Sequence, residues 1–403
     1  MEVLVEAIAE LAALASPRGA ERPLADRLVA WARHRWPDLG WTREGASLVA
    51  RSGTEGSELL LYSHLDTSLS GDPVADSGAT GRSTPIAPLT LSKDHASIAG
   101  FGLGVAKAPA AAAIIGYARA ATLLRDTGQP HRLTLLLAGG GTHFSPFGGP
   151  ALWPAERAGI DTYLSRHPRP AAAVVAKAGP DGILLAEPGA MFVRVRFTAP
   201  FVPVLARATA TPDGGLLAHL GTAVHAVEQW RADHLAARAD PTGAIAAEVG
   251  IGAVAGGLPG KPDLLPGRLD LHLYVVTLPG DDASSVADEL RGRLDGLIPG
   301  TAVEVDAHLD HPAGATPPES PIARHAVAAW TVRHGAPPPA ITGWKGSTDG
   351  AALRAYGVDT VRLGPAPRRD LDDPRRDVFA VADLVTYADL YADIAQRYAG
   401  TSL

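Results

Sequence analysis

The feature that most constrains the fold is an alternation of short apolar runs with helical stretches along the first 180 residues. The apolar runs lie at residues 47–50, 58–62, 133–137 and 172–176. Runs of this length with few polar residues are typical of strands that are buried on both faces of a sheet. An alanine-rich stretch at residues 106–124, typical of a buried helix, separates the second run from the third. This alternation predicts an α/β fold with a mostly parallel central sheet flanked by helices.

The pattern changes near residue 190. Strand-like segments at 191–198, 246–254 and 268–277 are interleaved with helical segments at 216–230 and 284–297. Strands and helices in that order predict a separate α+β layer. The α/β pattern then returns, with helices expected at 321–334, 349–356 and 383–399 and a strand at 360–363. The chain is therefore expected to hold one α/β domain, over residues 1–188 plus 306–403, with an α+β domain inserted at residues 189–305.

Composition excludes several kinds of chemistry. The chain contains no cysteine, so disulfides, thiolate metal sites and cysteine nucleophiles are ruled out. Its net charge is −7 and its basic residues do not cluster, which argues against a nucleic-acid partner. The first basic residue is Arg18, and Lys107, Pro109 and Arg119 interrupt the alanine-rich stretch. We therefore expect a cytoplasmic protein with neither a secretory leader nor a membrane partner.

A buried run ends in a recognisable motif at residues 59–67, which read LLLYSHLDT. This string resembles the first metal motif of the di-zinc aminoacylase and carboxypeptidase family, which includes acetylornithine deacetylase and succinyl-diaminopimelate desuccinylase. Similar segments follow the family's order at residues 15–21, 102–104, 251–257, 277–280 and 346–349. The resemblance implies a catalytic-like α/β domain, an inserted lid or dimerisation domain, and chemistry at an amide or other C–N bond of a small amino-acid derivative.

The resemblance also implies a two-zinc site, built from a histidine, a bridging aspartate, two glutamates, a further acid and a distal histidine. His64 matches the first ligand, and Asp66 matches the acid that orients it. Lys107 falls at the bridging acid, residues 140–143 (Gly-Gly-Thr-His) at the glutamate pair, and Lys177 at the further acid. The segment expected to hold the distal histidine, residues 371–378, contains none.

The positive charges of Lys107 and Lys177 determine whether a zinc pair can bind at these positions. Two divalent ions and two lysine ammonium groups repel one another strongly at short range, so they cannot share one pocket. We therefore expect a degenerate metal site with no metal ion or at most one, and no cofactor; zinc is possible but not expected. The alternative is that other acids of the chain bind zinc.

The candidate site residues fall into two groups. The catalytic candidates are His64, Asp66, Lys107, Lys177 and His143. The substrate-binding candidates are Asp349, Ser347, Arg207 and Asp372, of which Arg207 stands where the family's lid carries a histidine. Each also has a structural interpretation: a packed histidine, lysines that reach solvent, a helix cap at Asp349, and a solvated charged loop around Asp372.

Three functions remain open. The first is a metal-independent enzyme that uses lysine, histidine and aspartate in place of zinc. The second is a non-catalytic small-molecule binder or partner subunit, and the third is a zinc amidohydrolase with an atypical ligand set. A homodimer formed through residues 216–230 is expected from the resemblance.

Overall fold

The computed structural model describes residues 1–148 and 159–400, and its core is a six-stranded sheet. The strands, in spatial order, are β1 (Gly40–Glu44), β2 (Ser47–Ser52), β6 (Arg132–Ala138), β3 (Glu58–His64), β7 (Ala172–Ala176) and β16 (Asp359–Leu363). Strands β6, β3, β7 and β16 are parallel, whereas β1 and β2 add an antiparallel edge. The predicted α/β fold with a mostly parallel sheet is confirmed.

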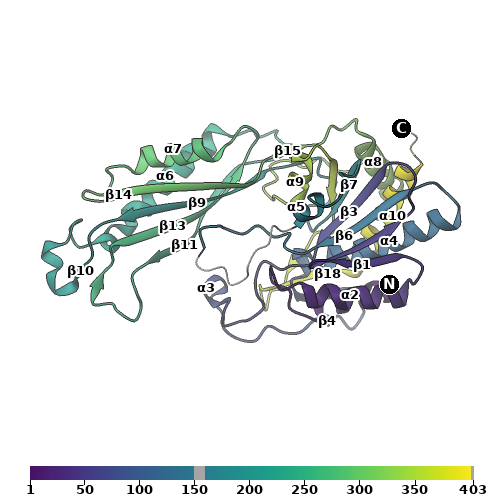
Figure 1. Cartoon of the computed structure of the whole chain (residues 1–403), viewed down its shortest axis with the longest axis horizontal. Helices are drawn as coiled ribbons and strands as arrows, with labels where there is room; N and C mark the ends of the chain where they lie inside the picture. The colour runs from purple at the N-terminus through teal and green to yellow at the C-terminus, as the bar shows by residue number, and fades with distance from the viewer. Residues whose placement is uncertain (149–158, 401–403) are drawn as a thin grey trace.

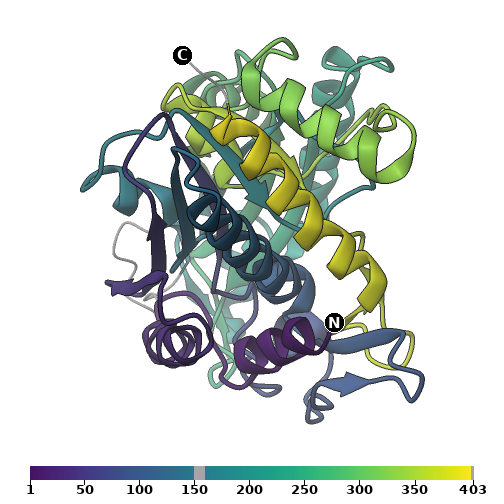
Figure 2. The ribbon, with the colours of Figure 1, turned by 90° about the vertical axis from the view of Figure 1, so that its right-hand side faces the viewer.

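One face of this sheet is covered by long helices, which follow the apolar and alanine-rich segments. They are α1 (Glu2–Ala12), α2 (Arg22–Arg35), α4 (Ala108–Asp126), α8 (Pro321–His334) and α10 (Val381–Ala399). Figure 2 shows α4 and α10 side by side across the sheet. A Cβ at Gly116 would lie only 2.7 Å from the Ala388 carbonyl oxygen and from the Cβ of Tyr391. The small residues of α4 therefore allow the two helices to pack closely.

The opposite face carries two short helices, α5 (Gly159–Leu164) and α9 (Asp349–Ala355), over a second apolar cluster. Leu60 and Tyr62 of β3 belong to this cluster, while Leu59 and Leu61 face the long helices. Since side chains alternate along a strand, His64 lies on the face of Tyr62. The chain thus directs His64 toward the side covered by α5 and α9.

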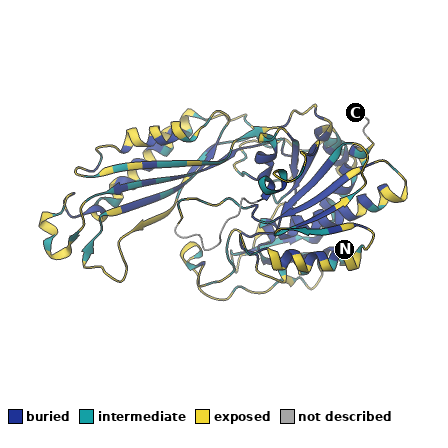
Figure 3. Cartoon of the chain, viewed as in Figure 1, coloured by how far each residue is buried: buried dark blue, intermediate teal, exposed yellow. Residues whose placement is uncertain are grey.

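A second, four-stranded antiparallel sheet extends away from the first (Figure 1). Its order is β11 (Glu248–Gly256), β13 (Arg268–Thr277), β9 (Gly189–Thr198) and β14 (Ala302–His311). Helices α6 (Leu220–Ala237) and α7 (Ala283–Leu294) pack on one side of it, and their outer faces are exposed (Figure 3). Strand β14 was not predicted, and it continues through the boundary expected at residue 305.

The remaining elements are short. A small sheet contains β17 (Arg368–Arg369), β18 (Arg376–Ala380), β5 (Ser97–Phe101) and β4 (Thr90–Leu91), and two strand pairs join β8 (Ala186–Glu187) to β15 (Gly314–Ala315) and β10 (Val202–Pro203) to β12 (Leu264–Leu265). The other helical turns are α3 (Ser77–Thr80), η1 (Leu103–Lys107), η2 (Val204–Thr209) and η3 (Leu216–His219). Among the described residues, no helix combines the length and apolar character needed to cross a bilayer.

Lys107 is buried where η1 meets α4. Its side chain is turned toward the end of α1, and its Nζ donates a hydrogen bond to the Leu14 carbonyl oxygen at 2.9 Å. Desolvation lowers the pKa of this ammonium from its ordinary 10.5 to about 8. A cation beside the carbonyl end of a helix is favourable, so the structure gives Lys107 a role in fixing α1.

The protonation of Lys107 is expected to make stability depend on pH. Its pKa is lower in the folded chain than in the unfolded chain, so the unfolded chain holds the extra proton between about pH 8 and 10.5. The free energy of unfolding should therefore rise across this range, by up to about 3 kcal/mol. Urea unfolding at several pH values measures this rise. The Lys107→Met variant should show a smaller rise, because only other lysines such as Lys177 then contribute to it, and an equal rise in both proteins would refute the assignment.

Candidate active site

His64 and Asp66 form a buried dyad at the carboxyl end of β3, where open parallel sheets bind their ligands. Both side chains are fully buried. His64 Nδ1 lies 3.0 Å from Asp66 Oδ1 and 3.1 Å from the Asp66 carbonyl oxygen. The Asp66 carboxylate also accepts hydrogen bonds from the backbone N–H groups of Gly141 (2.7 Å) and Thr142 (2.8 Å). The dyad is therefore held by the loop that follows β6.

These contacts determine the tautomer of His64. Both oxygens that face Nδ1 are acceptors, so Nδ1 carries the proton and Nε2 carries the lone pair. His64 Nε2 is buried and has no hydrogen-bond partner within the described chain. Burial raises the pKa of Asp66, but His64, the Thr142 N–H and Lys177 outweigh burial and hold that pKa below its usual range. Asp66 is thus an anion, and the free imidazole nitrogen can accept a proton or a ligand.

Lys177 lies near the dyad because it directly follows β7, the strand that pairs with β3, and its charge acts on Asp66. In the β3–β7 ladder Tyr62 pairs with Val175, so continuing the register by two residues sets His64 opposite Lys177. Adjacent strands are about 4.8 Å apart, and both residues lie on the same face. Burial lowers the pKa of Lys177, whereas the carboxylates of Asp349 and Asp66 act in the opposite direction. The structure therefore brings His64, Asp66 and Lys177 together.

Asp349 and His64 both lie against Gly141. Thr348, not Asp349, caps helix α9, because its hydroxyl accepts the Gly350 N–H. The Asp349 carboxylate instead accepts a hydrogen bond from the Tyr62 hydroxyl. A Cβ on Gly141 would lie 2.5 Å from His64 Cβ and 2.8 Å from Asp349 Oδ2. Glycine at position 141 thus allows the loop to pass between the two side chains.

Glu187 holds helix α9 in place through contacts to Thr348, its N-cap, and to Arg354. It is completely buried and accepts hydrogen bonds from the Thr348 hydroxyl (2.6 Å) and from Arg354 (2.7 Å), with Arg362 Nε at 3.6 Å. Burial raises the pKa of Glu187, but the two guanidinium groups outweigh burial and keep the pKa below its ordinary value. This ion cluster fixes the start of the helix that carries Asp349.

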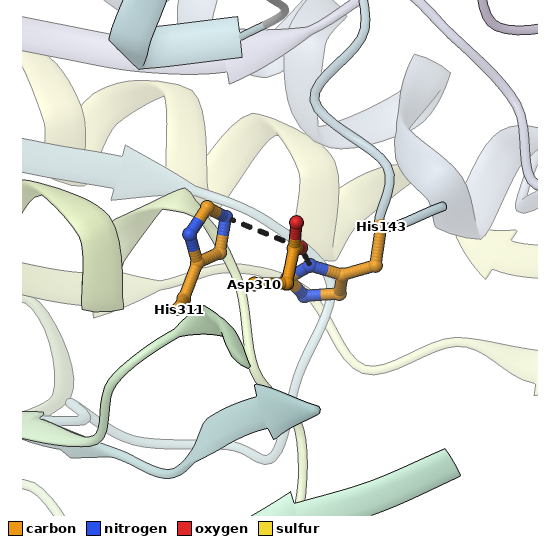
Figure 4. Close-up of side chains that lie close together, drawn as sticks. All are labelled: His143, Asp310 and His311. Atoms are coloured by element: carbon orange, nitrogen blue, oxygen red, sulfur yellow. Dashed lines mark hydrogen bonds and ion pairs between the residues drawn. The ribbon is translucent and has the colours of Figure 1, made fainter. Parts of the chain in front are cut away.

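His143 lies at a second polar cluster, with Asp310 and His311 (Figure 4). His143 Nδ1 is 2.6 Å from Asp310 Oδ2, and Nε2 is 3.2 Å from the Ser347 carbonyl oxygen. His311 Nε2 is 3.8 Å from Asp310 Oδ2 and 4.0 Å from Asp349 Oδ1. The Ser347 hydroxyl is buried without a hydrogen-bond partner in the described chain.

Three candidates lie outside this arrangement. Lys107 faces α1, as described above, because the turn at η1 directs its side chain there. Arg207 is exposed on η2, at the far end of the second sheet (Figure 1). Asp372 is exposed between β17 and β18, and its carbonyl oxygen accepts a hydrogen bond from Arg82. These positions correct the expectation that two lysines share the pocket, because only Lys177 stands beside His64.

The structure adds residues that the sequence did not single out. Tyr62 lies within an apolar run, and Asp310 and His311 lie on the unpredicted strand β14. Glu21 is also buried, and burial, reinforced by the Asp66 carboxylate, raises its pKa. In sequence Glu21 resembles an ordinary acid at the start of a helix, so no local signal distinguishes it.

Comparison with solved structures identifies proteins of the same fold. Human carnosine dipeptidase 1 superposes with a TM-score of 0.68 at 14% identity, covering 99% of this chain and 96% of that one. An M20 family metallo-carboxypeptidase from Sulfolobus solfataricus gives 0.64 at 15% identity, covering 99% of each chain. The Bacillus subtilis YXEP protein, described as a dinuclear metal binding peptidase of the M20 family, gives 0.60 at 12% identity, covering 99% and 98%.

The resemblance at the level of sequence is weak, because no protein-family model matches the chain and no curated protein matches it. The structural superpositions show that the chain has the fold of M20 family peptidases and amidohydrolases.

The residues around His64 do not fit a two-metal centre. Within residues 1–148 and 159–400, the only group of three His, Asp or Glu side chains with converging ligand atoms is His143, Asp310 and His311, which excludes His64. The charge of Lys177 also acts on Asp66 and on Asp349, so a second dication at these carboxylates would be repelled. A dinuclear site needs several carboxylates that converge on both ions, and among the described residues no such group includes His64.

Proposed function

We propose that this protein is a hydrolase that cleaves an amide or other C–N bond of a small amino-acid derivative without a zinc pair. The observation that carries the proposal is the buried His64–Asp66 dyad with its unpartnered Nε2. Lys177, whose charge acts on Asp66, follows the neighbouring strand at the same carboxyl end of the sheet. A histidine oriented by a carboxylate is a general base. A fixed ammonium group can stabilise negative charge that develops on a carbonyl oxygen.

The proposed reaction has two stages. His64 Nε2 removes a proton from a water molecule as its oxygen attacks the carbonyl carbon, and Lys177 stabilises the resulting oxyanion. Asp66 stabilises the imidazolium through the Nδ1–H bond. His64 then gives the proton to the departing nitrogen as the C–N bond breaks, which leaves a carboxylic acid and an amine. We propose that Asp349, whose charge acts on Lys177, and Ser347, whose hydroxyl is buried without a partner in the described chain, contact the substrate.

A non-catalytic small-molecule binder is the second candidate. The observation that favours it is that three polar atoms of the residues discussed above, His64 Nε2, Thr142 Oγ1 and Ser347 Oγ, are buried without partners in the described chain. Buried polar atoms of this kind normally have partners. A bound polar molecule would satisfy them whether or not it reacts.

The test is hydrolysis of a panel of N-acyl amino acids and dipeptides by the full chain after removal of metal with a chelator. We expect the Lys177→Met variant to lower kcat/KM by about 10²–10³-fold, because it removes the oxyanion-stabilising charge. The melting temperature should not fall, since the lost cation is partly buried and burial lowers its pKa, which shows that the folded chain disfavours the charge. The matched control is Lys93→Met, which removes an exposed lysine.

Each alternative gives a different result. Stabilisation by a panel compound without turnover would refute the hydrolase and support the binder. Activity that chelation abolishes and zinc restores would support a zinc amidohydrolase instead.

We also propose a cytoplasmic homodimer. In the described structure, strand β11 lies at the edge of its sheet and its residues are largely exposed. Its outer backbone groups can therefore pair with the same strand of a second copy. Helix α6 lies on the same domain and supplies the segment expected to accompany it.

A further inference from the structure

We infer that His143, Asp310 and His311 bind a single divalent transition-metal ion, at a site separate from the His64–Asp66 dyad. His143 comes from the loop after β6, whereas Asp310 and His311 end strand β14 of the second sheet. The inference rests on the geometry of these three side chains and does not depend on the proposed hydrolysis.

The donor atoms converge as a metal site requires. One ligand atom from each side chain lies within 4.8 Å of the other two. Bonds of 2.0–2.2 Å in tetrahedral geometry separate neighbouring ligand atoms by about 3.4 Å. The two separations from the Asp310 oxygen, 2.6 Å to His143 Nδ1 and 3.8 Å to His311 Nε2, lie on either side of this value. Small side-chain rotations would therefore suffice to coordinate an ion.

The hydrogen bonds of His143 independently indicate a cation. Both of its ring nitrogens face oxygen acceptors, the Asp310 carboxylate and the Ser347 carbonyl. A neutral imidazole has only one N–H, so one nitrogen lone pair would face an oxygen lone pair. A metal ion between Nδ1 and the carboxylate removes this conflict. Nε2–H then donates to the Ser347 carbonyl, the outer contact that usually orients a metal-bound histidine.

The ligand set indicates which ions fit. Two imidazoles and one carboxylate suit zinc and neighbouring transition metals, whereas calcium and magnesium prefer oxygen ligands. The three side chains keep 12–22% of their surface exposed, so an ion can enter from solvent. Thr142 precedes His143 in the chain, and the Ser347 carbonyl contacts His143. Both hydroxyls are buried without partners in the described chain, so we expect them to receive hydrogen bonds from a metal-bound water.

The test measures zinc bound to the full chain, prepared without a histidine tag and stripped with a chelator. After Zn²⁺ is added and unbound ions are removed, elemental analysis should give one zinc per chain, and zinc should raise the melting temperature. The His143→Ala and His311→Ala variants should lose both effects. The controls are His64→Asn and His225→Ala, an exposed histidine on α6, which should retain both.

Several results would overturn the inference. They are the absence of zinc in the unmodified chain, retention of zinc by a chain with both substitutions, and loss of zinc in His64→Asn. If the unmodified chain binds no zinc, then His143 carries a second proton, and this proton, not a metal ion, lies between His143 Nδ1 and Asp310. Failure of the proposed hydrolysis leaves these readouts unchanged, because neither of them uses a substrate.

Discussion

Replacement of His64 by asparagine is expected to lower kcat/KM by about 10²–10⁴-fold, the usual contribution of a general base. The asparagine amide can still donate to Asp66, so the loop held by that carboxylate should keep its place. No nitrogen lone pair then remains to accept the proton from water. The loss should therefore fall on kcat, with little change in KM. Steady-state kinetics on the best substrate of the panel measures both constants.

The control removes another buried histidine from the same sheet. His131 precedes β6, and its ring contacts the Gln129 carbonyl oxygen (2.8 Å) and the Ser52 hydroxyl (2.8 Å), away from the dyad. His131→Asn should keep kcat near that of the unmodified chain. A His64→Asn enzyme with unchanged kcat would exclude His64 as the base.

Replacement of Glu187 by glutamine is expected to lower the free energy of unfolding by about 3–5 kcal/mol. The substitution keeps the side-chain shape but leaves Arg354 and Arg362 as buried cations without an anion between them. Both arginine side chains are only 3% exposed, so solvent cannot compensate. Denaturant unfolding measures the loss, and Glu319→Gln, at an exposed position, is the matched control.

The effect should also depend on pH. Burial opposes ionisation of Glu187, but its cationic neighbours hold its folded-state pKa below the ordinary 4.5. Its contribution to stability is therefore complete above the pKa that Glu187 has in the unfolded chain, and it is lost as the pH falls through the pKa that Glu187 has in the folded chain. The difference in the free energy of unfolding between the unmodified chain and Glu187→Gln should therefore become smaller as the pH is lowered. A constant difference, or one below about 1 kcal/mol, would show that Glu187 does not carry this charge balance.

The sequence predicts most of the parallel sheet because its strands are continuous apolar runs, and buried strands need little else to be recognised. His64 and Asp66 are predictable for the same reason, since they directly follow such a run. Lys177 follows another run, and a parallel sheet brings the ends of neighbouring strands to one edge. Its proximity to His64 follows from these local patterns.

Other parts of the site depend on packing that no local pattern encodes. Lys107 occupies a position that suggests a pocket residue, but the turn at η1 directs its ammonium to the Leu14 carbonyl, just beyond the end of α1. Asp310 and His311 lie at the end of strand β14, which is only partly buried and shows weak apolar alternation. The sequence pattern therefore predicts neither this strand nor the cluster that these two residues form with His143. Glu21 becomes distinctive only when its distant neighbours bury it.

The carboxylate of Asp66 has a consequence for how this fold can vary. It fastens the tip of β3 to two successive amides that follow β6, so the imidazole and that loop move as one piece. Lengthening or shortening the loop would therefore retune the position of a proton-accepting atom several residues away. Variation in loop length here is therefore a second route, besides exchange of the histidine itself, by which such a scaffold can gain or lose reactivity.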